Sequence, residues 1–208
     1  MIKQVLFAIC LLLGVQVFAQ VKFGVKAGGN IATSKDLIAF PKNRVGWYGG
    51  VIMELPITRL FFFQPEILFS SKGYKVNQQI GADNNSVRFN YINIPLLIGY
   101  RFEKNSSILL GTELGYLAKA RLLIGKENNL DVSEQYPSKF DIAASVGLQH
   151  QFLKNTCVEV RYNYGFNMLY SIDATGQRHS DSRGANRVFQ IGLIYKLLNV
   201  KNTQKPIK

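Results

Sequence analysis

The sequence predicts an all-β fold, namely an eight-stranded antiparallel up-and-down transmembrane β-barrel with periplasmic termini. In residues 158–167, apolar or aromatic side chains occupy every second position, and polar or very small side chains lie between them. Segments with this pattern recur along the chain, at lengths near the roughly 9 to 11 residues with which a tilted strand crosses a bilayer. After residue 19 no run of roughly 18 apolar residues is present, so a membrane span must consist of strands.

Residues 1–19 have the pattern of a signal peptide. Lys3 gives a positively charged start, residues 5–15 form an apolar run, and small side chains precede the cut expected after Ala19. The alternative is a single-pass anchor, but Gln16 interrupts the apolar run, which is shorter than the roughly 20 residues needed to span a bilayer. We therefore expect the chain to be exported and the signal peptide to be removed.

The remainder of the chain is expected to form one domain. The barrel is predicted over residues 20–198, and residues 199–208 form a polar C-terminal tail. Removal of the signal peptide leaves Cys157 as the only cysteine. The mature chain is therefore expected to lack an internal disulfide and to depend on barrel closure for its stability.

The joints between the predicted strands alternate between short and long. Tight turns are predicted at residues 56–59, 103–106 and 153–156. Longer loops, rich in Asn, Asp, Ser, Lys and Gly, are predicted at approximately 33–43, 75–86, 121–138 and 171–185. Three turns at one end and four loops at the other are what eight antiparallel strands require when both termini are periplasmic.

One face of each strand is apolar and is predicted to contact lipid, because successive side chains of a strand point to opposite sides. In strand order the outward-facing candidates are Val21, Phe23, Val25; Val45, Trp47, Val51, Met53; Phe61, Phe63, Ile67, Phe69; Ile94, Leu96, Ile98, Tyr100; Ile108, Leu110, Leu114; Ile142, Val146, Leu148; and Phe189, Ile191, Leu193, Tyr195. The alternative, a soluble β-sandwich, would bury these residues between two sheets. Aromatic residues near predicted strand ends favour the barrel, whose girdles lie at the membrane interfaces: Tyr100, Phe102, Tyr116, Tyr164, Tyr170 and Tyr195.

The opposite face carries mixed acids and bases and is predicted to fill the lumen. An eight-stranded barrel has an interior only wide enough for side chains, and buried charges there must pair. The predicted lumen polar network comprises Lys26, Glu54, Glu66, Glu113, Glu159 and Arg161. Within it, Glu66, Glu113 and Glu159 are expected to pair with Lys26 and Arg161. A structural role is predicted for this network, with a conductive or gating role as the alternative.

Glycines and prolines modify the predicted strands. Glycines on the inward face make room for long side chains and allow strong coiling: Gly24, Gly28, Gly50, Gly111, Gly115, Gly147, Gly165 and Gly192. Pro65 and Pro95 each remove a ladder donor in mid-strand, which predicts bulges or bends at these positions.

Neither catalytic nor metal chemistry is predicted. His150 and His179 are the only histidines, and the neighbours of His179 in residues 178–183 point in different directions on an extended loop. A lipid-modifying outer-membrane enzyme remains an alternative. Two distant histidines and one cysteine cannot supply a zinc site, and the acidic residues Asp131 and Glu134 lack EF-hand spacing, so no metal and no cofactor is expected.

The formal net charge of +12 indicates anionic partners. A signal peptide argues against nucleic acid, which leaves outer-membrane lipid and lipopolysaccharide as counter-charges. A surface adhesin or ligand-binding barrel is a further alternative. Its contacts would be basic residues of the predicted loops: Lys35, Lys42, Arg121, Lys126, Arg178 and Arg183.

Six segments in order resemble the PorT-like outer-membrane β-barrel family of Gram-negative bacteria: 24–30, 63–73, 91–97, 140–142, 161–165 and 190–197. The resemblance covers nearly all of residues 20–198. This chain departs from the family pattern at three places. Asn93 stands where the family often has an acid, Ala143 stands where glycine is usual, and residues 196–198 lack the aromatic end that is common in the family. The resemblance implies an integral outer-membrane barrel and, for the founding members, a part in a protein-secretion apparatus. We therefore expect a non-enzymatic structural or accessory component with secretion-machine proteins as partners.

Overall fold

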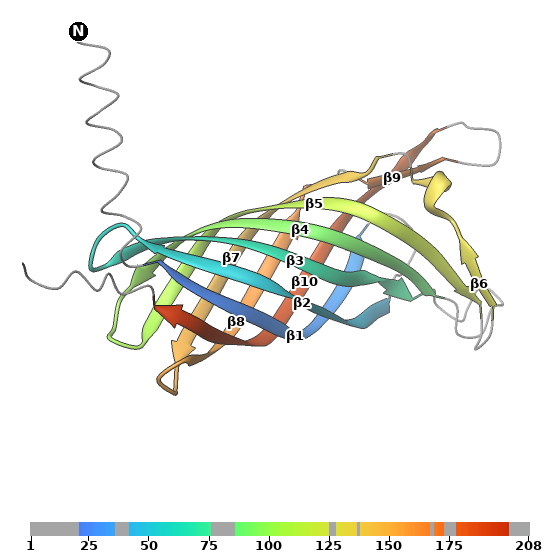
Figure 1. The fold of residues 1–208 in the computed structure, drawn as a ribbon. Coiled ribbons are helices and arrows are strands. Elements are labelled where there is room, and N and C mark those ends of the chain that lie inside the picture. Colours follow the sequence, from blue (N-terminus) through green and yellow to red (C-terminus); the bar gives the residue numbers. More distant parts are fainter. Residues whose placement is uncertain are drawn as a thin grey trace, which may run out of the picture.

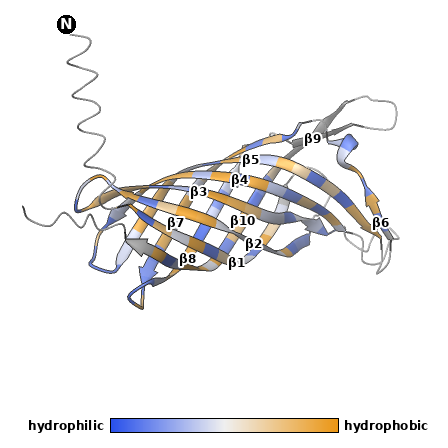
Figure 2. Cartoon of the chain, viewed as in Figure 1, coloured by the Kyte–Doolittle hydropathy of each residue, from blue (hydrophilic) through white to orange (hydrophobic). Residues whose placement is uncertain are grey.

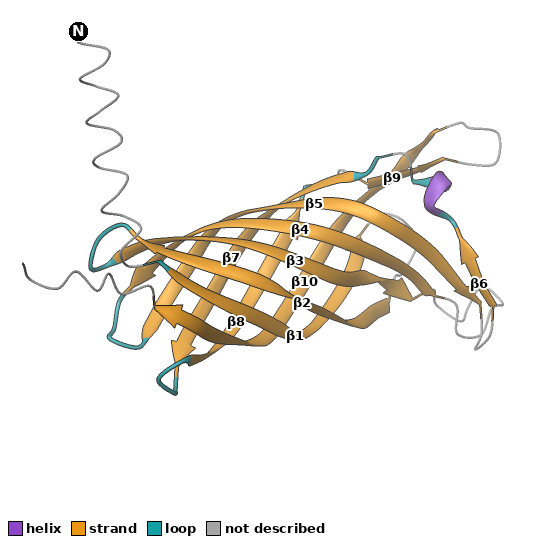
Figure 3. Ribbon diagram, in the orientation of Figure 1, coloured by secondary structure: helices purple, strands orange, loops and turns teal. Residues whose placement is uncertain are grey.

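The computed structural model describes residues 21–35, 42–75, 86–124, 128–136, 138–166, 169–172 and 178–199. The predicted signal peptide and nearly all of the predicted polar tail lie outside these residues. The strands are β1 (Lys22–Lys35), β2 (Lys42–Pro56), β3 (Phe61–Lys75), β4 (Ser86–Arg101), β5 (Ser106–Ile124), β6 (Asn128–Asp131), β7 (Phe140–Gln151), β8 (Thr156–Gly165), β9 (Leu169–Ile172) and β10 (Arg178–Asn199). A single turn of 3₁₀ helix, η3 (Ser133–Gln135), follows β6 (Figure 3).

Eight of these strands form a closed antiparallel ring. They pair in the order β1-β2-β3-β4-β5-β7-β8-β10, and β10 pairs back onto β1 from Lys22↔Asn199 to Lys35↔Ala185 (Figure 1). Closure removes both sheet edges along the ring. The prediction of an eight-stranded antiparallel barrel is confirmed.

The short connections lie together at one end of the barrel, which we call the short-turn end (Figure 1). They are the bends at 57–60, 102–105 and 153–155, close to the predicted turns. The opposite end is called the long-loop end. No helix in the described part of the chain is long and apolar enough to cross a membrane.

Two predicted loops are in part strands. β5 continues to Ile124 and pairs with the short strand β6, whereas a loop was predicted over 121–138. In the same way β9 pairs with the start of β10 inside the predicted loop 171–185. These hairpins project from the ring at the long-loop end (Figure 1). Hairpin pairing satisfies backbone groups that a loop would leave to water, and polar composition does not distinguish the two.

The strand faces follow the predicted alternation (Figure 2). Side chains of the apolar face are exposed or half-exposed on the outside of the ring, for example Val45, Trp47 and Ile67 at 72%, 58% and 58% exposure. The β-sandwich is therefore excluded, because it would cover this face. Val21 was wrongly assigned outward. It is buried, and it precedes β1, so the strand pleat does not direct its side chain.

The structure has no bulge at Pro65 or Pro95, where a bulge or a bend was predicted. The register between β3 and β4 is the same at Pro65↔Leu96 and at Leu68↔Asn93, with no pairs at Glu66 and Ile67 between them, and pairing between β4 and β5 is unshifted at Pro95↔Glu113. A proline removes one donor from the ladder but does not require an extra residue. The register shift between β4 and β5 lies instead between Asn90 and Tyr91.

Two glycines make room inside the ring for a tyrosine. Gly28 and Gly192 pair across β1 and β10, and the hydroxyl of the buried Tyr48 side chain lies against both. A Cβ built on Gly28 would come within 2.8 Å of that hydroxyl, and one on Gly192 would come closer still. The prediction that inward glycines make room for a long side chain is confirmed at these two positions.

Candidate functional site

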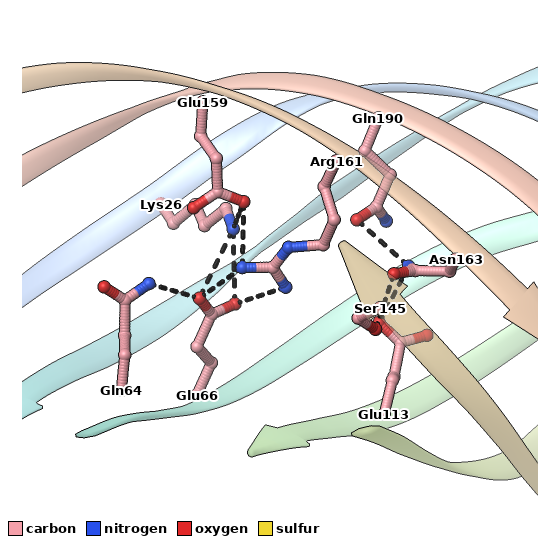
Figure 4. Close-up of polar contacts among 9 residues, drawn as sticks. All are labelled: Lys26, Gln64, Glu66, Glu113, Ser145, Glu159, Arg161, Asn163 and Gln190. Carbon is pink, nitrogen blue, oxygen red and sulfur yellow. Dashed lines mark hydrogen bonds and ion pairs between the residues drawn. The ribbon is translucent and has the colours of Figure 1, made fainter. Parts of the chain in front are cut away.

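The centre of the lumen holds an ion-pair cluster of two acids and two bases (Figure 4). Arg161 of β8 binds Glu66 of β3 with two contacts, Nη2 to Oε1 at 2.6 Å and Nη1 to Oε2 at 3.0 Å. Its Nη2 also lies 2.8 Å from Glu159 Oε1. Lys26 of β1 completes the cluster, with Nζ 2.6 Å from Glu159 Oε1 and 3.3 Å from Glu66 Oε2. None of these four residues is more than 2% exposed.

The local sequence explains why this central cluster forms. Glu159 and Arg161 are two residues apart on β8, so both side chains point into the ring. Glu66 and Lys26 occupy inward positions of β3 and β1, and Gln64 Nε2 donates to Glu66 Oε1 at 2.7 Å. The four formal charges cancel, which is the condition under which buried ions are tolerated. The structure thus brings together four of the six residues predicted for the lumen network.

Glu113 belongs to a second cluster, nearer the long-loop end. Its Oε1 lies 2.6 Å from Lys72 Nζ, and its Oε2 accepts from Asn163 Nδ2 at 3.0 Å. The expected pairing of Glu113 with Lys26 or Arg161 is not among the ion pairs of the described residues. Lys72 was missed as its partner, although Lys72 shares the inward parity of Gln64 and Glu66 on β3.

Glu54 belongs to a third cluster, at the short-turn end. Its Oε1 lies 2.9 Å from Lys22 Nζ and 2.5 Å from Arg101 Nη2, and its Oε2 lies 2.9 Å from Lys196 Nζ. In the described part of the chain none of these contacts joins Glu54 to the central cluster. The single network predicted from the sequence is therefore divided into three clusters along the barrel axis.

The long-loop end of the lumen holds an apolar cluster, which the sequence reasoning did not predict. Inward side chains of β3, β4 and β5 meet residues that flank η3 in one buried cluster: Tyr74, Val87, Phe89, Tyr91, Leu117, Ala120, Val132 and Tyr136. The rings of Phe89 and Tyr136 pack edge to face with centroids 5.0 Å apart. Burial raises the pKa of the Tyr136 hydroxyl. We call this group the aromatic plug.

The segment around η3 is tied to β5 by Ser133. The Ser133 hydroxyl accepts from Ala120 N at 2.9 Å and lies 2.6 Å from Asp131 Oδ1. Hydrogen bonds from Ser133 and the contact with Lys119 hold the pKa of Asp131 below its usual range. The side chain of Lys119 is 41% exposed, and its Nζ lies 3.0 Å from Asp131 Oδ2 on β6, the strand that pairs with the end of β5.

The described residues hold no group of three or more His, Cys, Asp or Glu side chains that could bind a metal ion. His150 is exposed on the outer wall, with Nδ1 3.0 Å from Ser106 Oγ. The Ser106 hydroxyl donates to Glu103 at 3.1 Å. The carboxylate thus contacts the hydroxyl, whereas in a catalytic triad it orients the imidazole. The side chain of His179 lies outside the described residues.

Two of the six basic loop candidates have described side chains. Lys42 is exposed at the start of β2, and Arg121 is half-buried in β5. Lys35, Arg178 and Arg183 lie in strands, but their side chains are outside the described residues. Lys126 is itself outside the described part of the chain.

Comparisons with known proteins give a family and a fold. A family model described as "Outer membrane protein beta-barrel domain" matches residues 18–171. No curated protein matches the chain. Among solved structures, Neisserial surface protein A is 13% identical with a TM-score of 0.57, covering 84% of this chain and 97% of that one. Ail, the attachment invasion locus protein of Yersinia pestis, is 15% identical with a TM-score of 0.50, covering 86% and 99%.

Proposed function

The chain belongs to the outer membrane protein β-barrel domain family, and on that premise we propose that it is a non-enzymatic, non-conducting barrel with a structural or accessory role. The observation that carries the proposal is the filled lumen. The central cluster of Lys26, Glu66, Glu159 and Arg161 is buried, and the aromatic plug fills part of the lumen between this cluster and the long-loop end. In this proposal the short-turn end of the barrel faces the periplasm, and the signal peptide is removed after Ala19.

The first test is electrical. Purified barrel inserted into planar bilayers should give no stable channels, because ion pairs and aromatic rings occupy the path that ions would take. Insertion is checked on the same sample by the shifted migration of folded barrel on unheated gels. Reproducible single-channel steps would show that the lumen conducts and would contradict the proposal.

Outer-membrane lipid and lipopolysaccharide are the proposed surroundings. The exposed apolar face supplies the surface for acyl chains, and the net charge of +12 suits anionic headgroups. Neither contact requires a cofactor.

A role in protein secretion is the finer part of the proposal, supported by the resemblance to the PorT-like family. A deletion strain should lose specific proteins from its culture medium, and the wild-type gene should restore them. Quantitative mass spectrometry of the medium measures both effects, with total outer-membrane protein as the control. If the set of secreted proteins were unchanged in the deletion strain, the proposed role in protein secretion would be contradicted.

A surface-binding barrel is the second candidate. Like charges face each other across strands toward the long-loop end, as Lys42↔Lys75 and Arg88↔Arg121. Such pairs are unfavourable unless an anion lies near them. The Ail structure carries the heparin analogue sucrose octasulfate, which is a property of that protein. Capture of intact cells by immobilised heparin, together with an unchanged set of secreted proteins, would favour this candidate.

A further inference from the structure

A cavity of about 90 Å³ opens at the short-turn end of the barrel. Its lining comes from each of the eight strands of the ring, near their short-turn ends, and from the turn between β4 and β5. The charged residues among its lining are Lys22, Glu54, Arg101, Lys104 and Lys196, and Gln149 lies beside them. We call this cavity the vestibule.

The vestibule has an excess of positive charge. Glu54 is the one carboxylate among the described residues that line it, and it contacts Lys22, Arg101 and Lys196. Lys104 adds a fourth cation on the turn. The side chains of Arg101 and Lys196 are only 22% and 14% exposed, so water screens their charge incompletely. A second anion in the vestibule would balance this charge.

The Arg101 guanidinium is fixed in place. It lies 4.4 Å from the centroid of the Phe62 ring, and its Nη1 donates to the Arg59 carbonyl at 3.3 Å. Because the side chain is held from two sides, it presents its charge to the vestibule with little loss of conformational entropy on binding.

A buried amide donor without an acceptor lines the same cavity. Gln149 is 5% exposed, and its Nε2 has no hydrogen-bond partner among the described residues. An unpaired buried donor is unfavourable by itself, and a ligand with acceptor oxygens would satisfy it. This observation is independent of the charge excess and points to the same ligand chemistry.

We propose that the vestibule binds a small dissolved oxyanion of the phosphate class. Arg101, Lys104 and Lys196 supply charge, and Gln149 supplies a neutral donor, which together match the acceptor oxygens of such an anion. The cavity of about 90 Å³ admits a small ion and excludes long polyanions. Its interior position, inside the ring and away from the exposed apolar face, favours a dissolved ion over the headgroup of a lipid.

The test is isothermal titration of inorganic phosphate into the mature, detergent-folded barrel at low ionic strength. Phosphate should bind, and Lys104→Gln and Gln149→Met should each weaken binding roughly three- to tenfold through loss of a contact. Lys154→Gln is the matched control, because Lys154 is an exposed lysine on another short turn and does not line the vestibule. It should leave binding unchanged.

Glu54 provides a test with the opposite sign. Glu54→Gln removes the carboxylate that competes for Lys22, Arg101 and Lys196, so phosphate should bind more tightly although the barrel is less stable. Lys104 is exposed on a turn, so its variant is expected to fold. Absence of phosphate binding, or equal binding by the Lys104→Gln and Lys154→Gln variants, would overturn the proposal. Binding of dihexanoyl phosphatidylglycerol without binding of inorganic phosphate would do so too, because it would assign the site to lipid.

Discussion

Arg161→Ala should lower the free energy of unfolding of the barrel by about 3–5 kcal/mol, because it leaves buried acids without their partner. Arg161 donates to both carboxylate oxygens of Glu66, at 2.6 and 3.0 Å, and it also contacts Glu159. After the substitution, Lys26 alone would face two buried carboxylates. Urea unfolding of the barrel in lipid vesicles, followed by tryptophan fluorescence, measures the change.

Two variants separate the loss of charge balance from the loss of a large side chain. Arg59→Ala removes an exposed arginine from a turn and should change the free energy of unfolding by less than about 0.5 kcal/mol. Adding Glu159→Gln to Arg161→Ala restores one acid opposite one base, and part of the lost stability should return. Arg161→Ala with wild-type stability would mean that the central cluster does not hold the barrel together.

Ile94→Arg should destabilise the barrel by about 2–4 kcal/mol in lipid vesicles, because it places a cation on the lipid face near the middle of a membrane-spanning strand. Ile94 is exposed on the outside of the ring, midway along β4. The same urea titration in vesicles measures this change. In a soluble β-protein an arginine at an exposed site would cost little, so the size of the effect reports contact with lipid.

Ile57→Arg is the matched control for Ile94→Arg. Ile57 is also exposed, at 62%, but it lies on the bend at 57–60 beyond the end of β2. An arginine there reaches water, so the free energy of unfolding should change by about 0–1 kcal/mol. Equal effects of the two substitutions would contradict the assignment of Ile94 to the hydrocarbon region.

The ring and its two faces could be predicted because side-chain alternation is a local property of a strand. Glu159, Arg161 and Asn163 are inward for the same reason that Tyr162 and Tyr164 are outward. Alternation predicts whether a side chain faces the lumen or the lipid. It does not predict the position of that side chain along the barrel axis, which depends on strand tilt and register. Glu113 was therefore placed on the correct face and given the wrong partners, since Lys72 lies at its height.

The aromatic plug could not be predicted from alternation. Phe89 and Tyr91 have the inward parity of β4, where a polar lumen would call for polar side chains. Their burial depends on Val132 and Tyr136, which come from a segment that the sequence describes only as polar and turn-rich. A contact between a strand and a distant loop leaves no periodic signal in either.

Closure of the ring between β1 and β10 has a consequence for folding kinetics. The closing pairs, such as Lys22↔Asn199, join residues from nearly opposite ends of the chain. They are the least local contacts of the fold, and contacts of this kind carry a large loop-closure entropy and form slowly. Until β10 arrives, β1 and β8 each leave a row of backbone donors and acceptors that other chains can pair with. The time that the chain spends open, rather than its final stability, therefore governs its exposure to aggregation.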